Sequence, residues 1–481
     1  MRDSLFKDEK GIAMVVVLGV MLILTTLAFA AVAISENELV SSSHDRDSTE
    51  ALHIAEAGVQ KALWQLEQFG NSMNPKTFTI TVNGGTAEVN AVQDMGQNWY
   101  WTVESTGTYG NAHRKIKVTV FNFSMWNMNI ATGSNKSLAS GGNGILGTAS
   151  VDGPFYVRGN VELSGNSAIT GGPLFIKTGS LVLLNNSATL GLPGSPISAY
   201  IEPSGNNGDI VDKDGLRILD NPNQSQVFLS QLSNQCPDIE VPPMDSMESY
   251  RNIAKSESSV PPLPSTYYRD TYVSVDPNIS GGYKVLDDDG SVAMGDVDLR
   301  HTYHLDSSVS NFGSSTCGIG WDTSGGSKKL HVMGTVYVDG NLVIGDSKND
   351  TVVYDGRGTL IVNGNITIRG KLIPASAGVM DSAHVLGLVT NEEITADVQH
   401  CGGTGRDNPD IAGALFAAKK VSLVQNNTTF VGSMIAGTLN FAYGTNNCHL
   451  YTDDSLPSFL PPSLPGSTKF MAMTASWREA K

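Results

Sequence analysis

Acidic side chains gather in two short segments of the chain, and such clusters are where a calcium ion could bind. Asp212 and Asp214 lie in "GDIVDKDGL", and Asp287 and Asp289 lie in "VLDDDGSVAMGDVDL". A calcium loop of the EF-hand type needs acids at alternate positions before its glycine and a glutamate beyond it. In the first segment the next alternate position is Ile210, and in the second segment the acids are adjacent. Both segments are interpreted as solvated turns, with calcium as the alternative, and no other cofactor is expected.

Cysteines are the second set of residues whose side chains could do chemistry. The chain has four of them: Cys236, Cys317, Cys401 and Cys448. On the oxidising side of a membrane an even number of cysteines favours disulfides, and four cysteines allow three pairings. His400 and His449 each neighbour a cysteine and would complete a two-His, two-Cys metal set. Adjacent His–Cys ligands fit poorly around one tetrahedral ion, so disulfides or free thiols are preferred and no metal site is predicted.

Residues typical of catalysis do not cluster in the sequence. Polysaccharide-cleaving enzymes built on stacked β-coils need acids, or acids with Arg or Lys, together on one coil face. Here the outward positions of the strand-like segments are mostly Thr, Ser, Asn and Val with isolated charges, and no G-x-S-x-G motif precedes a helix. The sequence therefore predicts a protein that is not an enzyme. Its Thr- and Asn-rich faces suit a carbohydrate or another surface ligand better.

Composition indicates the kind of scaffold that carries these residues. The chain has 481 residues, of which 51 are glycine and only 16% are charged. Such a composition suits many short strands joined by tight turns, and the length allows two or three domains. The formal net charge of -16 argues against a nucleic-acid partner, because phosphates require a basic face. It fits an exported or surface-exposed protein.

An apolar run at residues 12–34 is the first predicted element. Within it only Thr25 and Thr26 are markedly polar. At about 1.5 Å per residue a helix of this run spans roughly 35 Å, enough to cross the hydrocarbon core of a bilayer. A secretory signal has a shorter apolar core and ends in a small-residue cleavage site. The run is therefore predicted to be a transmembrane helix rather than a secretory signal.

Helix-compatible sequence continues past the apolar run. The first proline of the chain is Pro75, and apolar residues recur at steps of three and four. This spacing places six residues along one helical face: Leu52, Ala55, Val59, Ala62, Leu66 and Phe69. We expect one helix over residues 12–70, apolar all round over 12–34 and amphipathic over 35–70.

Basic residues at the start of the chain predict its orientation. Arg2, Lys7 and Lys10 precede the apolar run, and the next basic residue is Arg46. The positive-inside rule then places the N-terminus in the cytoplasm and everything after about Ser35 outside. The chain is predicted to be a single-pass inner-membrane protein.

The charged leader that ends at Gly11, the apolar helix and the segment "ALHIAEAG" at residues 51–58 together resemble PilX-type minor pilins of type IV pili. The resemblance covers residues 1–70. It implies that a prepilin peptidase removes the leader, residues 1–11, and that Ile12 becomes the N-methylated first residue. Major pilins carry a glutamate at the fifth mature position, which is Val16 here. PilX-like pilins and K-type pseudopilins share this absence, which implies a place at or near a filament tip.

This resemblance implies a minor pilin that takes part in pilus assembly and then reaches the pilus or cell surface. Its implied partners are other minor and major pilins, the prepilin peptidase and the inner-membrane assembly platform. Two alternatives stay open: a pseudopilin of type II secretion, and a membrane-tethered adhesin or scaffold that never enters a filament. A K-type pseudopilin would carry a large helical insertion, which this Gly-rich, strand-rich sequence lacks.

Two hairpins are predicted in residues 71–128. "TFTITVNGGTAEVNAV" alternates apolar and polar residues around a turn at "NGG". "WYWTVESTGTYGNAHRKIKVTVFNF" repeats the pattern with Ile116, Val118 and Val120 on one face and a turn at "YGN". We expect these strands to form a small antiparallel sheet that packs on the amphipathic half of the helix.

A quasi-repeat follows in residues 129–235 and 273–450. "FYVRGNVELSG", "VYVDGNLVIG" and "LIVNGNITIRG" share the pattern apolar-x-apolar-x-G-N-apolar-x-apolar. Such repeats favour a stacked solenoid, because one coil alone cannot bury its apolar face. The segments resemble bactofilin-like and other β-helix domains that occur with PilX-type N-termini, and a β-sandwich is the alternative. The predicted fold class is α+β, with a right-handed parallel β-solenoid as the head.

The repeat also predicts which side chains point inward. The inward set is Val336, Val338, Leu342 and Ile344 in one segment and Leu360, Val362, Ile366 and Ile368 in the other. Tyr337, Asp339 and Val343 are expected to face out, and Val338 should lie beside Val362. Residues 236–272 are predicted to be a Pro-rich excursion with a short helix at 244–255. Residues 451–481 are predicted to be a Pro-rich tail whose final strand returns to the body.

Overall fold

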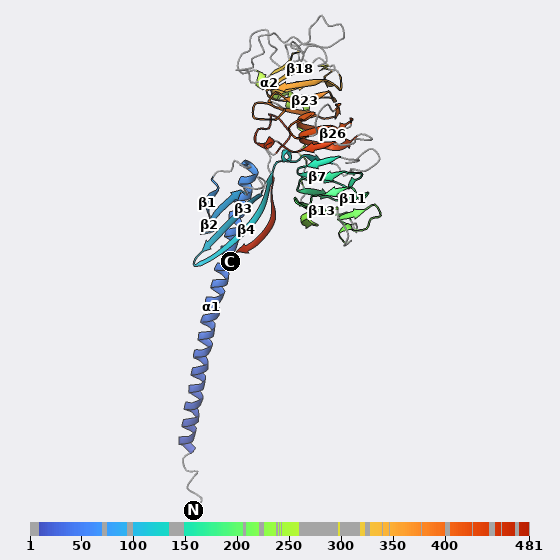
Figure 1. Ribbon diagram of the computed structural model, residues 1–481. Helices are drawn as coiled ribbons and strands as arrows, with labels where there is room; N and C mark the ends of the chain where they lie inside the picture. The colour runs from blue at the N-terminus through green and yellow to red at the C-terminus, as the bar shows by residue number, and fades with distance from the viewer. Residues whose placement is uncertain are drawn as a thin grey trace, which may run out of the picture. The chain divides into compact units, whose positions relative to one another are not determined.

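The chain divides into two compact units in the computed structural model (Figure 1). One unit combines Met1–Asn122 with Met471–Lys481, and the other is Phe123–Phe470. The structure describes residues 9–69, 75–93, 100–133, 149–204, 208–220, 226–236, 239, 241, 243–258, 297–298, 318–322, 328–338, 340–345, 347–376, 378–399, 405–425, 427–441, 448–453, 455–466 and 471–480.

The first unit begins with one long helix, α1 (Glu9–Phe69), as the sequence predicts. Its sheet has the strand order β1-β2-β3-β4-β29. These strands are β1 (Thr77–Val82), β2 (Gly85–Gln93), β3 (Tyr100–Tyr109), β4 (Ala112–Phe123) and β29 (Met471–Ala480). Strands β1 to β4 pair antiparallel, so both predicted hairpins are confirmed. The last strand of the chain lies at the edge of the sheet, beside β4.

The turn between β1 and β2 shows why this hairpin forms. Asn83 and Gly84 both have positive φ, 49° and 82°. Two successive positive φ angles are the signature of a type I′ turn, whose twist matches that of the flanking strands, and Asn-Gly favours it. The "NGG" segment therefore sets the register in which Val82 pairs with Gly85.

The second half of α1 packs on the inner face of this sheet. Ala55, Val59, Ala62 and Leu66 are buried against a cluster from β2, β3 and β4 that includes Trp101, Val103 and Ile116. The predicted helical face is confirmed at these four positions, and Leu52 lies partly buried at its margin. Phe69 is an exception, because its side chain is 49% exposed. It is the last residue of α1, and its ring meets the half-exposed Trp64 edge-on, with 6.5 Å between centroids.

Glycines let the helix approach the sheet closely. A Cβ on Gly58 of α1 would collide with the hydroxyl of Ser105 and lie 2.9 Å from Val89 Cγ2. A Cβ on Gly107 of β3 would collide with the carbonyl oxygen of Ala51 and lie 2.5 Å from the Ala55 nitrogen. The "AEAG" segment of α1 thus supplies the small side chains that this contact requires.

The second unit is built from short parallel strands in three columns. The first column contains β18 (Lys328–Val338), β21 (Arg357–Val362), β24 (Val385–Thr390), β26 (Ile411–Leu423), β27 (Thr429–Phe441), β5 (Ile130–Thr132), β7 (Phe155–Arg158), β10 (Leu174–Lys177), β13 (Ile197–Glu202) and β15 (Leu229–Ser233). Each strand pairs in parallel with the next one in this order.

Two further columns complete the coils. The second contains β16 (Val297–Asp298), β19 (Leu342–Ile344), β22 (Ile366–Arg369), β25 (Glu393–Asp397) and the ends of β26 and β27. In the coils of the earlier repeat segment, a separate three-stranded sheet takes the same place: β8 (Val161–Leu163), β11 (Leu181–Leu183) and β14 (Ile210–Asp212). The third contains the starts of β18, β26 and β27 with β20 (Thr351–Asp355), β23 (Lys371–Pro374), β28 (His449–Tyr451), β6 (Ser150–Asp152), β9 (Ala168–Ile169) and β12 (Thr189–Leu190). Strand β17 (Gly318–Asp322) is antiparallel to β18. The fold is α+β with a parallel stacked-coil head.

The coils do not stack in chain order. Met434 of β27 pairs with Ile130 of β5, and His449 of β28 pairs with Ser150 of β6. The earlier repeat segment therefore stacks on the end of the later one, and the two form one continuous column of coils. The two segments are separate in the sequence, and their local patterns do not predict this order.

The predicted inward faces are confirmed. Val338 pairs with Val362, Leu342 with Ile366 and Ile344 with Ile368, and all eight residues of the predicted inward set are fully buried. Tyr337 alternates with Val336 and Val338 and faces out of the interior as predicted, yet it is only 6% exposed. Other segments of the second unit therefore cover the outer side of the first column. Asp339 lies outside the described residues.

A proline-rich segment, residues 456–466, is one of these covers, and it begins with a short 3-10 helix, η5 (Leu456–Ser458). Three side chains of the stack hold it: Arg357 Nη2 donates to Leu460 O at 2.7 Å, Thr359 Oγ1 donates to Pro462 O at 2.5 Å, and Thr335 Oγ1 lies 2.7 Å from Ser463 Oγ. Trp126, in η2 (Met125–Asn127), donates from Nε1 to Pro465 O at 3.0 Å. Proline suits this segment because its carbonyl oxygen can still accept a hydrogen bond from these side chains, and no strand partner requires the N–H that proline lacks.

A second helix, α2 (Met247–Ser258), contacts β18 on the same unit. The short helix predicted at residues 244–255 is therefore confirmed, with a start three residues later. Its Tyr250 is buried, and burial raises the pKa of this phenol to about 12. A further 3-10 turn, η3 (Ile218–Asp220), follows β14.

Candidate functional site

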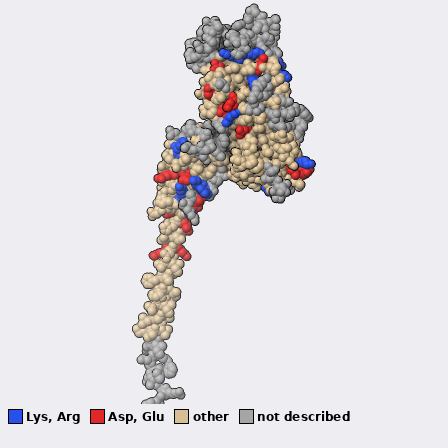
Figure 2. Space-filling model, in the orientation of Figure 1, with Lys and Arg blue, Asp and Glu red and all other residues tan. Residues whose placement is uncertain are grey.

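The first half of α1 is the largest exposed apolar surface among the described residues. Met14, Phe29 and Leu39 are 67%, 77% and 70% exposed. The helix is long and apolar enough to cross a membrane, with a mean hydropathy of 2.7 in its most apolar window, none of which is buried. Figure 2 shows a stretch of α1 without charged side chains, and residues 14–35 of the helix contain none. Burying such a surface is favourable by roughly 25 cal/mol per Å², so lipid or another apolar helix is its natural environment.

Polar groups within this half are satisfied by the helix itself. Thr25 Oγ1 donates to Met21 O at 2.9 Å, and Thr26 Oγ1 donates to Leu22 O at 3.0 Å. A hydroxyl bonded to the preceding turn leaves no unpaired donor in hydrocarbon. The two threonines that interrupt the apolar run are therefore compatible with a membrane-spanning helix.

The residues implied in processing lie at the start of the same helix. Gly11 and Ile12 are both within α1, and Val16 follows with its side chain 58% exposed. Since Val16 faces the surroundings of the helix, a carboxylate there would be free to meet a neighbouring chain. Cleavage and methylation at these residues stay predictions.

The acidic candidates divide into described and undescribed residues. Asp212 Oδ1 accepts hydrogen bonds from the backbone nitrogens of Asp214 and Leu216, each at 2.9 Å. This carboxylate thus closes its own turn, as expected for a solvated turn. Asp287 and Asp289 lie outside the described residues. Within the described part of the chain, no group of three His, Cys, Asp or Glu side chains is arranged to hold a metal ion.

Two of the four cysteines are described, and both are buried. Cys236 is 4% exposed and its carbonyl accepts a hydrogen bond from Lys177 Nζ at 3.1 Å. Cys448 carries a free thiol, whose Sγ lies 3.8 Å from Gln425 O, and burial raises its pKa to about 11. Cys317, Cys401 and His400 lie outside the described residues, so a disulfide involving them stays a prediction.

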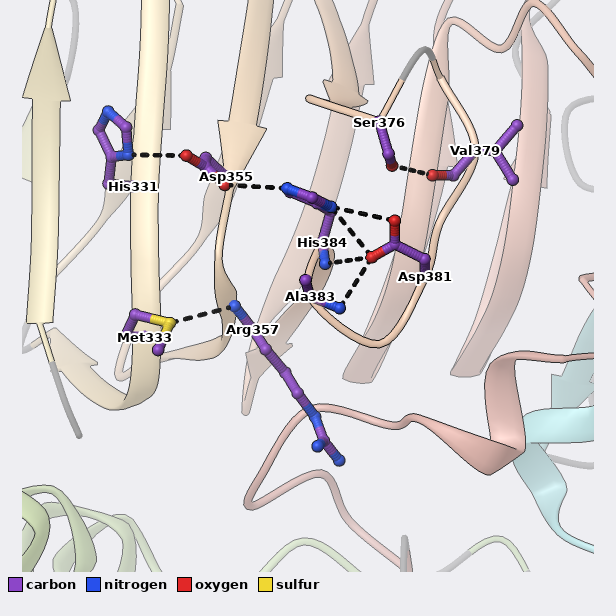
Figure 3. A network of polar contacts seen from close by, with 9 residues as sticks. All are labelled: His331, Met333, Asp355, Arg357, Ser376, Val379, Asp381, Ala383 and His384. Carbon is purple, nitrogen blue, oxygen red and sulfur yellow. Dashed lines mark hydrogen bonds and ion pairs between the residues drawn. The ribbon is translucent and has the colours of Figure 1, made fainter. Parts of the chain in front are cut away.

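A row of alternating histidines and aspartates lies on the coil stack (Figure 3). The carboxylate of Asp355 lies between two rings, with Oδ2 3.4 Å from His331 Nδ1 and Oδ1 3.2 Å from His384 Nε2. His384 Nδ1 in turn lies 3.0 and 3.1 Å from the two oxygens of Asp381. Because the Asp355 carboxylate separates the two rings, the four side chains form a row rather than a cage around one ion.

Coil register brings this row together. His331 of β18 pairs with Asp355, the last residue of β20, while Asp381 and His384 lie in the segment that precedes β24. No motif in the sequence marks these four residues as a group. The predicted pairing of Val338 with Val362 has an offset of 24 positions, and the same offset applied to His331 leads to Asp355. The predicted register is therefore the signal from which the contact between His331 and Asp355 could have been predicted.

Hydrogen bonds keep one member of the row anionic. Burial acts to raise the pKa of Asp381, but it is outweighed by the His384 ring and by the backbone N–H groups of Ala383 and His384, at 2.7 and 2.8 Å. The pKa of Asp381 is therefore lowered from its usual value. An ionised carboxylate accepts only, so any ring nitrogen that faces it must donate.

Comparison with known proteins gives three findings. A family model described as "Domain of unknown function (DUF7305)" matches residues 266–458. The search of curated proteins found no match. Among solved structures, the crystal structure of the competence-associated pilin ComZ from Thermus thermophilus is similar with a TM-score of 0.45 and 15% sequence identity, over 90% of this chain and 97% of that one.

Proposed function

We propose that the protein is a minor pilin that is anchored in the inner membrane by α1 and joins a type IV pilus or a related filament. One observation carries this proposal: a single continuous helix has one half covered by a small antiparallel sheet and the other half bare and apolar. An anchor alone would need only the bare half. A helix that is rigidly continuous into a folded unit can also pass from lipid into a filament core without refolding.

The proposed topology follows from charge and hydropathy. Arg2, Lys7 and Lys10 keep the N-terminus in the cytoplasm, and residues 12–34 span the membrane. The small sheet of the first unit and the whole second unit then lie outside. The net charge of -16 suits that exposed location.

The finer role is proposed from the residues at the start of α1. A prepilin peptidase cuts after Gly11, and Ile12 becomes the methylated N-terminus. Val16, in place of a glutamate, leaves the helix without a carboxylate for the amine of the next subunit, which favours a place at or near the tip. Other pilins, the peptidase and the inner-membrane assembly platform are the proposed partners.

The stacked coils are proposed to be a display head rather than an enzyme. Their inward faces are filled by apolar side chains, and the outward face of the first column carries buried side chains such as Phe175 and Ile361. Outward positions of the second column carry polar residues such as Thr367 and the ion pair Lys420–Glu393 at 2.9 Å. Such a rigid polar surface suits a carbohydrate or another surface ligand. No metal or organic cofactor enters the proposal.

Processing of the N-terminus tests this function. The intact mass of the N-terminal peptide from wild-type protein is expected to begin at methylated Ile12. The variant Gly11→Val should retain the leader while inserting normally in the membrane. Gly19→Val is the matched control, because a Cβ at Gly19 meets no atom within 4 Å, and it should be processed like wild type. Wild-type protein that keeps residues 1–11 would contradict the proposal.

A further inference from the structure

His384 lies between two carboxylates of the row. Its Nδ1 lies 3.0 Å from Asp381 Oδ1, and its Nε2 lies 3.2 Å from Asp355 Oδ1 (Figure 3). Both ring nitrogens are therefore within reach of a carboxylate oxygen. The ring joins two parts of the chain, since Asp355 ends β20 and Asp381 lies in the segment before β24.

The chemistry of imidazole makes this geometry sensitive to protonation. A neutral ring has one N–H donor and one acceptor nitrogen, whereas the imidazolium donates from both nitrogens. Two ionised carboxylates accept hydrogen bonds and cannot donate. The neutral ring can thus bond to Asp381 or to Asp355, and only the protonated ring can bond to both.

His384 gives segment 378–384 a polar side-chain contact with the neighbouring coil, beside the buried side chain of Met380. Asp381 fixes the segment internally through the backbone nitrogens of Ala383 and His384. Val385 N donates to Gly356 O at 3.1 Å where β24 begins. Between these points, His384 Nε2 reaches across to Asp355. The segment also carries Val379, whose side chain is 52% exposed.

Several other charged or titratable groups surround the ring. His331 on β18 shares Asp355 with it, and Arg357 on β21 directs its guanidinium away, to Leu460 O at 2.7 Å. The buried Tyr354 has its pKa raised by burial and by the charges of Asp453 and Asp381. On the other side of segment 378–384, the backbone oxygen of Asp407 lies near Gly378.

We propose that His384 is a proton-dependent clasp that fixes segment 378–384 to the coil stack. In mildly acidic solution the imidazolium bonds to Asp381 and Asp355 together, and the segment is held. As the pH rises and the ring loses a proton, one of the two hydrogen bonds is lost and the segment opens more often. Carboxylates in general are ionised above about pH 4, and imidazoles in general are charged below about pH 6.5.

Hydrogen exchange of the full chain in detergent micelles tests the clasp. Amide exchange of a peptide covering residues 378–387 is measured at pH 5.5 and pH 7.5, corrected for the intrinsic rates and referred to a peptide from β26. In wild type the opening of this segment should increase about tenfold at the higher pH, the factor expected for losing one charge-assisted hydrogen bond. In His384→Gln the opening should be frequent at both pH values.

The matched control is His331→Gln. This variant removes the other ring beside Asp355 and leaves both carboxylate contacts of His384 in place, so it should keep the pH dependence of wild type. If amide exchange of residues 378–387 does not depend on pH in wild type, or depends on it fully in His384→Gln, the proposal is overturned. If His384→Gln fails to fold, the wild-type comparison with the β26 peptide decides alone. The proposed pilin function does not enter this test.

Discussion

The two units bury their apolar residues in contrasting ways. In the first unit one helix lies against one sheet, and the contact depends on small residues: Gly58 and Gly107 allow the backbones to approach where a Cβ would collide. In the second unit branched residues such as Val338, Val362 and Ile366 repeat from coil to coil and fill the interior. In the contact between helix and sheet, sensitivity to substitution is concentrated in a few positions. A stack of similar coils spreads the same packing rule over many inward positions.

The largest expected effect is on the interior of the coil stack. Ile366 is fully buried and Thr367 beside it points outward. Ile366→Asp would place an unpaired charge in the interior and should reduce the free energy of unfolding by about 4 kcal/mol or more. Thr367→Asp is the matched control, with an expected change of about 0.5 kcal/mol or less. Thermal melts of the full chain in detergent measure both, and equal destabilisation would show that the faces are wrongly assigned.

A smaller effect is expected at the helix–sheet contact. Gly107→Ala would bring a methyl group against the backbone of Ala51 and Ala55, and the resulting separation of α1 from β3 should cost about 2 kcal/mol. Gly194→Ala is the control, because a Cβ there meets nothing within 4 Å. The unfolding transition is followed by the fluorescence of Trp101, which is fully buried in the same core. A variant as stable as the control would mean that the close approach is unimportant.

The smallest expected effect concerns a charge pair near the end of the coil stack. Arg217 donates to both oxygens of Asp209 at 2.8 and 2.9 Å, and these hydrogen bonds hold the pKa of Asp209 below its usual value despite burial. A depressed carboxyl pKa contributes stability at neutral pH that is lost as the pH falls through the folded-state value. Since Arg217 is 43% exposed, screening limits the contribution to about 1 kcal/mol.

Urea unfolding of Asp209→Asn and wild type at pH 7 and pH 3 measures this contribution. The difference between the two proteins should shrink at the lower pH. Asp214→Asn serves as control, because Asp214 meets Lys213 only at 3.9 Å on an exposed surface. A constant difference between wild type and Asp209→Asn at both pH values would contradict the assignment.

Local periodicity accounts for the parts of the fold that could be predicted. Steps of three and four predicted the buried face of α1 at Ala55, Val59 and Ala62, and "NGG" predicted the first turn of the sheet. The repeat "VYVDGNLVIG" predicted both the inward residues and the pairing of Val338 with Val362. In each case neighbouring residues determine the structure, so the pattern is visible within a few positions.

What could not be predicted depends on contacts between distant residues. Nothing local indicates that Met434 pairs with Ile130, because every coil end offers a similar strand edge. Tyr337 has the alternation of an outward residue and is buried, and Thr335 on the same side of the strand contacts Ser463, 128 positions along the chain. The ring of His384 reaches Asp355 across 29 positions of sequence, which neither periodicity nor a short motif encodes.

The contrast within α1 itself is the basis of the proposed function, and fractionation of surface filaments tests it most directly. Filaments are sheared from cells, purified away from membranes and probed for this protein with an antibody against its head. The account predicts that the protein is present in sheared filaments at low abundance relative to the major pilin and that Gly11→Val removes it from them. Wild-type protein that stays entirely in the membrane fraction would contradict the account and identify α1 as an anchor alone.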